Sequence, residues 1–167
     1  TDVLKKIIDT VHLRPKDRWA LVIEGGAMRS IFTAGVLDAM QETLLPRIND
    51  IISVSAGTGC ALSFLCEQKG RSANIFLNYL SQRQFIDYRR LLTADNVMDL
   101  RYAIEDIHTI HVPWNIDKYK HKKAAFHVSM LNAQTGETRY VEPNSKNIIP
   151  AMIAACNVPY LTREPAV

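Results

Sequence analysis

Short apolar runs alternate with stretches of helical periodicity in the first part of the chain. Trp19 to Ile23 is a continuous apolar run, which is typical of a buried strand. Apolar residues then recur at helical spacing from Ile31 to Leu44, and Ile48 to Val54 is a second buried run. Ala56 to Lys69 has the pattern of a helix that ends at Gly70. This alternation predicts an α/β fold with parallel strands at the centre of the sheet.

The pattern changes in the second part of the chain. Ser72 to Ile110 is expected to be mostly helical, with breaks that the periodicity does not locate. Ala124 to Leu131 alternates like a strand, and Arg139 to Glu142 follows a turn as its hairpin partner. Ile148 to Cys156 is predicted to form a final helix.

Composition and charge then narrow the class of protein. The 167 residues fit one domain, and 47% apolar with 22% charged residues is ordinary for a globular protein. The net charge is +3, and only Asp117 to Lys123 concentrates basic residues, which argues against a nucleic-acid partner. We interpret Lys118 to Lys123 as a solvated loop, with contact to an anionic membrane surface as the minority interpretation.

Cysteines and histidines give no sign of a metal or cofactor. The three cysteines show no metal-binding spacing and are expected to be reduced thiols. His108 and His111 stand three residues apart in a predicted helix, where a surface or packed pair is favoured over a zinc site without a third ligand. We therefore predict no metal and no cofactor.

Two turns that contain glycine follow the two buried runs, at the sheet edge where ligands bind in open α/β folds. The first turn is Glu24 to Ser30, whose glycines allow backbone to approach a reacting group closely. The second is Ser53 to Gly57, with small residues two positions on either side of Ser55. This spacing is typical of a nucleophile elbow, in which a sharp turn exposes the central side chain.

Both turns resemble motifs of the patatin-like phospholipases. Leu21 to Met40 is similar to the family's glycine-rich oxyanion motif and the helix behind it, and Ser53 to Gly59 is similar to its elbow. Phe126 to Tyr140 resembles the family's later hairpin, and Ala154 to Pro159 resembles the helix and proline before its last catalytic strand. The resemblance runs from about Trp19 to the C-terminus.

The resemblance implies a three-layer α/β fold, with a mostly parallel central sheet and helices on both faces. It also implies hydrolysis of phospholipid or lysophospholipid acyl esters by a Ser–Asp dyad, with Ser55 as the nucleophile. The oxyanion hole would be formed by backbone amides of Gly25, Gly26, Ala27 and Met28. The supporting positions are Ser53, Ala56, Gly57 and Arg29. We expect a location in the cytoplasm or at a membrane surface; secretion stays open because the sequence does not begin with Met.

The chain departs from the family pattern at three glycine positions. Ala27, Ser30 and Ser53 each stand where the family usually has glycine. A methyl group at Ala27 would obstruct the loop if its φ were positive, and Ser53 raises the strain expected on approach to Ser55.

The catalytic aspartate is the largest gap. The family carries it in an Asp-Gly motif beyond the segment that matches Val158 and Pro159, and this sequence has no Asp-Gly pair. Asp95, Asp99, Asp106 and Asp117 lie in the wrong segment. We therefore expect one domain over 1–167 that is truncated before the strand with the aspartate.

Three alternatives remain. The first is a catalytically dead relative that binds lipid or acts as a scaffold. The second is an α/β-hydrolase triad, in which Asp99 or Asp106 would precede His127 in the chain order that such triads follow. The third is a nucleotide-binding module, for which Gly57 to Leu62 lacks the third glycine.

Overall fold

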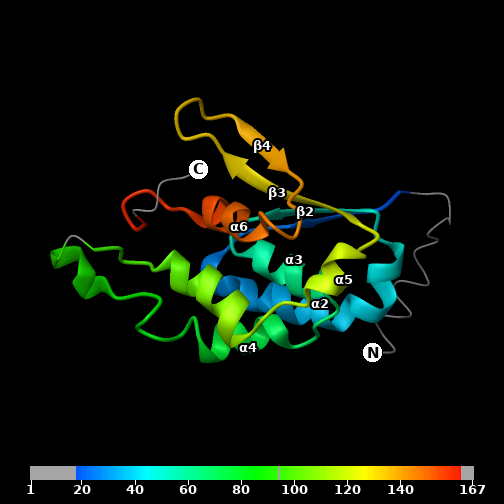
Figure 1. The fold of residues 1–167 in the computed structure, drawn as a ribbon, viewed down its shortest axis with the longest axis horizontal. Helices are drawn as coiled ribbons and strands as arrows, with labels where there is room; N and C mark the ends of the chain where they lie inside the picture. The colour runs from blue at the N-terminus through cyan, green and yellow to red at the C-terminus, as the bar shows by residue number, and fades with distance from the viewer. Residues whose placement is uncertain (1–17, 94, 163–167) are drawn as a thin grey trace.

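The centre of the protein is a four-stranded sheet. In a computed structural model, which describes residues 18–93 and 95–162, the strands are β1 (Ala20–Ile23), β2 (Asp50–Val54), β3 (Ala125–Leu131) and β4 (Thr138–Val141). They lie in the order β1-β2-β3-β4 (Figure 1). The first three are parallel, and β4 pairs antiparallel with β3 as a hairpin. The predicted α/β fold with parallel central strands is confirmed.

Helices connect the strands and pack around the sheet (Figure 1). The α-helices are α2 (Ser30–Leu44), α3 (Gly57–Leu65), α4 (Arg71–Asn78), α5 (Ile116–Lys120) and α6 (Ile148–Cys156). Three short 3-10 helices are η1 (Ala27–Arg29), η2 (Leu45–Arg47) and η3 (Tyr88–Leu92), and η4 (Arg101–His111) is a π-helix. Helix α3 contacts β1 and β2, whereas α6 contacts β3 and η4.

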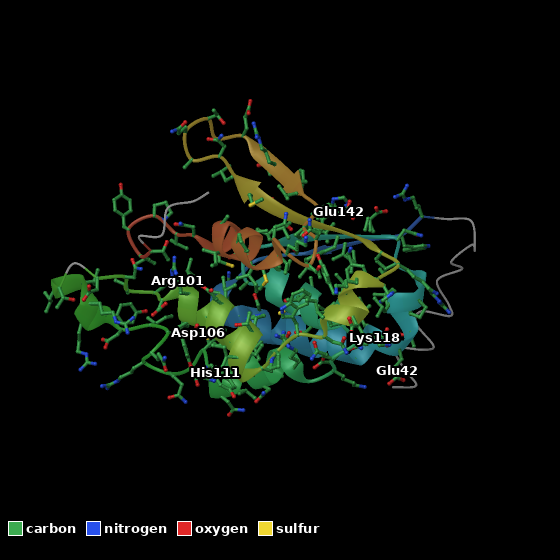
Figure 2. All side chains as sticks on the ribbon, viewed as in Figure 1. Glu42, Arg101, Asp106, His111, Lys118 and Glu142 are labelled. Atoms are coloured by element: carbon green, nitrogen blue, oxygen red, sulfur yellow. The ribbon has the colours of Figure 1, made fainter. Side chains whose placement is uncertain are left out.

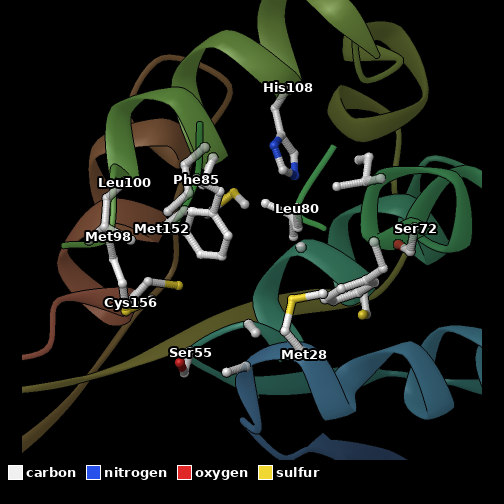
Figure 3. Close-up of a pocket in the computed structure, with 18 of the residues that line it drawn as sticks. Met28, Ser55, Ser72, Leu80, Phe85, Met98, Leu100, His108, Met152 and Cys156 are labelled. Atoms are coloured by element: carbon white, nitrogen blue, oxygen red, sulfur yellow. The ribbon is translucent and has the colours of Figure 1, made fainter. Parts of the chain in front are cut away.

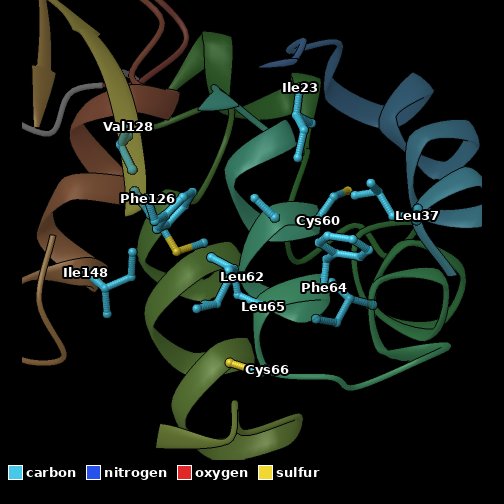
Figure 4. Close-up of a cluster of buried hydrophobic side chains, with 14 of the residues drawn as sticks. Ile23, Leu37, Cys60, Leu62, Phe64, Leu65, Cys66, Phe126, Val128 and Ile148 are labelled. Atoms are coloured by element: carbon cyan, nitrogen blue, oxygen red, sulfur yellow. The ribbon is translucent and has the colours of Figure 1, made fainter. Parts of the chain in front are cut away.

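The core lies between the sheet and α3. Because side chains alternate along a strand, Ile51 and Phe126, which are register partners on adjacent strands, point to the same face and are fully buried. Leu62 and Phe64 of α3 pack in the same cluster (Figure 4). The opposite face of β1 carries Val22, whose side chain is exposed.

Two sequence predictions were wrong about helix boundaries. The helix expected from Ala56 to Lys69 is shorter, because α3 ends at Leu65 and a turn leads to Gly70. Glu67, two residues beyond α3, has a φ of +56°, a left-handed conformation that ends the helix. Gly70, with a φ of +78°, then precedes α4. The segment Ser72 to Ile110 is less helical than expected, since an irregular stretch separates α4 from η4.

Helix η4 has the wide hydrogen-bond pattern of a π-helix. At its C-terminal end the amide of Val112 donates to the carbonyl of Ile107, five residues back, at 2.7 Å. Such segments are rare and often lie at functional sites. On η4, Arg101 is exposed and Asp106 is half-buried (both labelled in Figure 2).

The basic segment Lys118 to Lys123 is not simply a loop, because α5 includes its first residues. The side chain of Asn115 accepts from the amide of Lys118 and caps this helix. Lys118 also forms an ion pair with Glu67 at 2.9 Å (Figure 2 labels Lys118). The segment precedes β3, so it lies near the amino ends of the parallel strands.

No helix within residues 18–93 and 95–162 is long and apolar enough to cross a membrane. The same ranges contain no group of three or more His, Cys, Asp or Glu side chains that could hold a metal ion. The three cysteines are free thiols, as the sequence predicts.

Candidate active site

A sharp turn connects β2 to α3, and Ser55 stands at its apex. Ser55 has a φ of +50°, although it is not glycine. The left-handed conformation costs an L-residue about 1–2 kcal/mol, and such strain is typical of functional sites. The carbonyl of Ser55 accepts a hydrogen bond from the amide of Thr58 at 2.9 Å, which closes the turn.

Two glycines allow this turn to pack against the turn that follows β1. A Cβ atom at Gly57 would lie 2.4 Å from the carbonyl oxygen of Glu24, far inside the contact distance. A Cβ atom at Gly25 would lie 2.8 Å from the Cβ of Ser55. Both positions therefore require glycine because of close backbone approach, and Gly25 lies directly against Ser55.

The two serines of the elbow lie in different environments. Ser53 is fully buried, and its Oγ lies 3.1 Å from Thr58 Oγ1 and 3.4 Å from the carbonyl oxygen of His127, within hydrogen-bond distance of both. Ser55 is half-buried and lines a cavity. Ser53 thus stabilises the end of the strand, whereas the hydroxyl of Ser55 is the one placed at the cavity.

The glycine-rich turn leads from β1 through η1 to α2. Gly25 and Gly26 donate no backbone hydrogen bond to a described residue, so their amides are available to another acceptor. Ala27 has a φ of +47°, the conformation in which its methyl group was expected to obstruct the loop. Its side chain, like that of Met28, is on the cavity wall.

The remaining supporting positions lie around the elbow. Ala56 lines the cavity and precedes α3, so the amino end of that helix is next to Ser55. Arg29 is exposed at the end of η1 and forms no ion pair with a described residue. Ser30 is buried at the start of α2, and its carbonyl accepts from the thiol of Cys60.

The cavity beside Ser55 is predominantly apolar, opens to solvent and has a volume of about 110 Å³. Figure 3 shows Ser55 at one side, with Phe85, Leu80 and Met152 lining the space across from it. The walls come from α3, α4, η4 and α6 and from the segment between α4 and η4.

Cys156 is the titratable group in contact with Ser55. Burial raises the pKa of its thiol to about 12, and a hydrogen-bond contact with the Ser55 hydroxyl opposes this shift. The thiol is therefore protonated near neutral pH and cannot remove a proton from Ser55. No His, Asp or Glu side chain in the described part of the chain forms a hydrogen bond with Ser55.

The triad alternative is not assembled in the structure. The Nε2 atom of His127 lies 4.0 Å from Asp50, at the amino end of β2, whereas Ser55 follows the carboxyl end of that strand. The carboxylate of Asp99 accepts from the amide of Tyr102 at the start of η4. In the described part of the chain, no hydrogen bond joins Asp99 or Asp106 to His127, or any of the three side chains to Ser55.

The other chemical alternatives also lack support. Gly57 to Leu62, the segment similar to a nucleotide-binding loop, lies in α3, where Thr58 and Leu62 are fully buried. It therefore offers no open loop to a phosphate. His108 is buried, while His111 packs against the rings of Tyr79 and Tyr102, so the two are not a paired ligand set.

Sequence reasoning missed two polar residues of the cavity. His108 was interpreted only as a surface or packed residue, and Cys156 only as a reduced thiol. Both line the same cavity as Ser55. The apolar spacing of the segment from Ser72 to Ile110 contains no signal for this, because the cavity is built from elements far apart in the sequence.

Comparison with known proteins agrees with the geometry of the two turns. The family model described as "Patatin-like phospholipase" matches residues 21–167. A curated relative, "Uncharacterized protein YjjU" of Escherichia coli (strain K12), is 36% identical over 100 residues. That match includes 59% of this chain and 28% of the relative, so this chain spans well under half of the longer protein. Since the family model matches nearly all of the chain, the protein belongs to the patatin-like phospholipase family, a family of lipid acyl hydrolases.

Proposed function

We propose that this protein is a serine acyl hydrolase that cleaves phospholipid or lysophospholipid acyl esters, with Ser55 as the nucleophile. The single observation that carries the proposal is the positive φ of Ser55 at the turn between β2 and α3. This strained turn holds the hydroxyl at an apolar cavity. Membership of the patatin-like phospholipase family supports a lipid substrate.

In the proposed reaction the Ser55 oxygen attacks the ester carbonyl and forms an acyl-enzyme, which water then hydrolyses. Negative charge develops on the carbonyl oxygen in the tetrahedral intermediate. We assign the oxyanion hole to the backbone amides of Gly25, Gly26, Ala27 and Met28. The amides of Gly25 and Gly26 donate to no described backbone acceptor, which supports this assignment. Loss of one such donor typically costs about 3–4 kcal/mol of transition-state stabilisation.

The proton of Ser55 needs a base, and we assign this role to an aspartate of the full-length protein outside the described residues. Asp99 and Asp50 are hydrogen-bonded elsewhere, and no described carboxylate forms a hydrogen bond with Ser55. The substrate's acyl chain would occupy the apolar cavity, because Ser55 lies at its edge.

The test is active-serine labelling of the full-length protein. A fluorophosphonate probe is expected to modify Ser55, as located by mass spectrometry, and Ser55→Ala is expected to abolish both labelling and fatty-acid release from lysophosphatidylcholine. Ser53→Ala is the matched control. It loses hydrogen bonds inside the fold but no group at the cavity, so it should keep most of the activity. Equal loss in both variants, or activity in Ser55→Ala, would overturn the proposal.

A second candidate is a lipid-binding protein without catalysis. The observation that favours it is the absence of a base next to Ser55 within the described residues, beside a well-formed apolar cavity. The same experiment separates the two functions. A binding protein would take up fatty acid yet leave the fluorophosphonate unreacted.

A further inference from the structure

The cavity beside Ser55 contains a buried histidine that the proposed reaction does not use. His108 projects from η4 into the cavity, across from Ser55 (Figure 3). Only 5% of its surface is exposed, and the neighbouring wall residues Leu80, Phe85 and Met152 are apolar. A polar ring in this position is unexpected if the cavity serves only to hold a hydrocarbon chain.

The ring of His108 is uncharged and incompletely hydrogen-bonded. Burial, followed by the nearby charge of Arg71, lowers its pKa to about 3, so the imidazole is neutral at physiological pH. Its Nδ1 atom has no well-formed hydrogen bond within the described residues. A buried polar atom without a partner is costly, because it has lost its hydrogen bonds to water.

The surroundings of the ring indicate which nitrogen faces a ligand. The carbonyl groups of Ala103 and Ile104, on the same helix, act on the ring as hydrogen-bond acceptors. Because Nδ1 is the ring nitrogen nearer to the helix backbone, we assign the proton to Nδ1, which leaves a lone pair on Nε2. Nε2 lies 3.5 Å from the point where a Cβ atom at Gly59 would stand, and Gly59 also lines the cavity. The absence of a side chain there keeps the approach to Nε2 open.

His108 is not placed to act as the base for Ser55. It lies on the other side of the cavity, and no hydrogen bond joins the two side chains in the described structure (Figure 3). A histidine with so low a pKa is also a weak proton acceptor. Its location instead suits a contact with a part of the substrate remote from the ester.

We propose that the cavity binds the substrate's acyl chain and that His108 selects chains carrying a hydroxyl group, which donates a hydrogen bond to Nε2. The inference rests on the proposed hydrolase function, since it assigns a substrate class to the same site. The substrates favoured would be lipid esters of hydroxylated fatty acids. Ser72, whose buried hydroxyl also lines the cavity, adds a second polar group to the same enclosure.

The test compares matched pairs of medium-chain acyl esters, one unsubstituted and the other with a single hydroxyl at a defined carbon. In the full-length protein, kcat/KM for the best hydroxylated isomer should exceed that of its unsubstituted partner by about tenfold, which corresponds to about 1.4 kcal/mol. His108→Leu should abolish this ratio, whereas His108→Gln, which keeps a hydrogen-bonding group, should retain part of it.

A variant at another position and a binding measurement on the wild type test the same inference even if the His108 variants fail to fold. Gly59→Ala keeps the histidine but places a methyl group 3.5 Å from Nε2, so it should also reduce the ratio. Calorimetry with the free acids should show tighter binding of the hydroxylated acid to wild type. A ratio near one for every isomer in a wild-type protein whose Ser55 is labelled by fluorophosphonate would overturn this inference alone. Absence of labelling would instead overturn the proposed hydrolase function.

Discussion

Backbone strain at Ser55 can be measured by comparing two substitutions that both remove its hydroxyl. Ser55→Ala keeps a Cβ atom in the left-handed conformation at φ +50°, whereas Ser55→Gly removes it. The left-handed conformation costs an L-residue about 1–2 kcal/mol, and glycine loses about 0.5–1 kcal/mol through its greater freedom in the unfolded chain. The glycine variant should therefore be the more stable of the two by about 0.5–1 kcal/mol.

The assay is urea unfolding of both variants, and the two free energies are compared when the slope of free energy against urea is the same for both. For a protein of 167 residues, 1 kcal/mol corresponds to a shift of about 2–4 °C in Tm. Ala56, the residue after Ser55, is the matched control, because its φ of −56° is an ordinary right-handed value. Ala56→Gly should destabilise by about 0.5–1 kcal/mol. The reasoning fails if Ser55→Gly is no more stable than Ser55→Ala while Ala56→Gly shows its expected loss.

Two further changes in stability follow from the structure. Gly57→Ala should destabilise the protein by about 2–3 kcal/mol in urea unfolding, because the new methyl group would lie 2.4 Å from the carbonyl oxygen of Glu24. Gly35→Ala is the control: it has open space around it in α2 and should stabilise the protein by about 0.5–1 kcal/mol. Equal effects of the two substitutions would contradict the packing described for Gly57. His108 has a folded-state pKa of about 3 against 6.5 when unfolded, so the unfolded chain binds more protons between these pH values. The free energy of unfolding should thus fall by about 1.6 kcal/mol from pH 6.5 to pH 5, and a pH series on His108→Gln that showed the same extra fall would contradict the assignment.

The sequence predicted the elements with strong local signals. The strands that end at Ile23 and Val54 were recognisable from their apolar runs, and Ile148 to Cys156 forms α6 as predicted. The elbow was identified because close backbone packing restricts residue size at fixed spacing around Ser55. The contact of Gly25 with Ser55 follows the same steric logic.

The parts that escaped prediction depend on tertiary context. The end of α3 at Leu65 coincides with a positive φ at Glu67, and η4 has the wide turns of a π-helix; the spacing of apolar residues reports neither feature. The environment of His108 depends on Arg71 and Gly59, which are far from it in sequence. Its role could not be inferred from its spacing to His111.

The tight fit of Gly25 against Ser55, and of Gly57 against the carbonyl of Glu24, has a consequence for how this enzyme family could diversify. The groups proposed to bond to the reacting ester are joined as one inflexible block, which tolerates little change in either turn. The opposite wall is supplied largely by side chains of α4 and η4 rather than by close backbone contact. Under the proposed function, replacements on that wall would change which acyl chain fits and leave the two turns as they are.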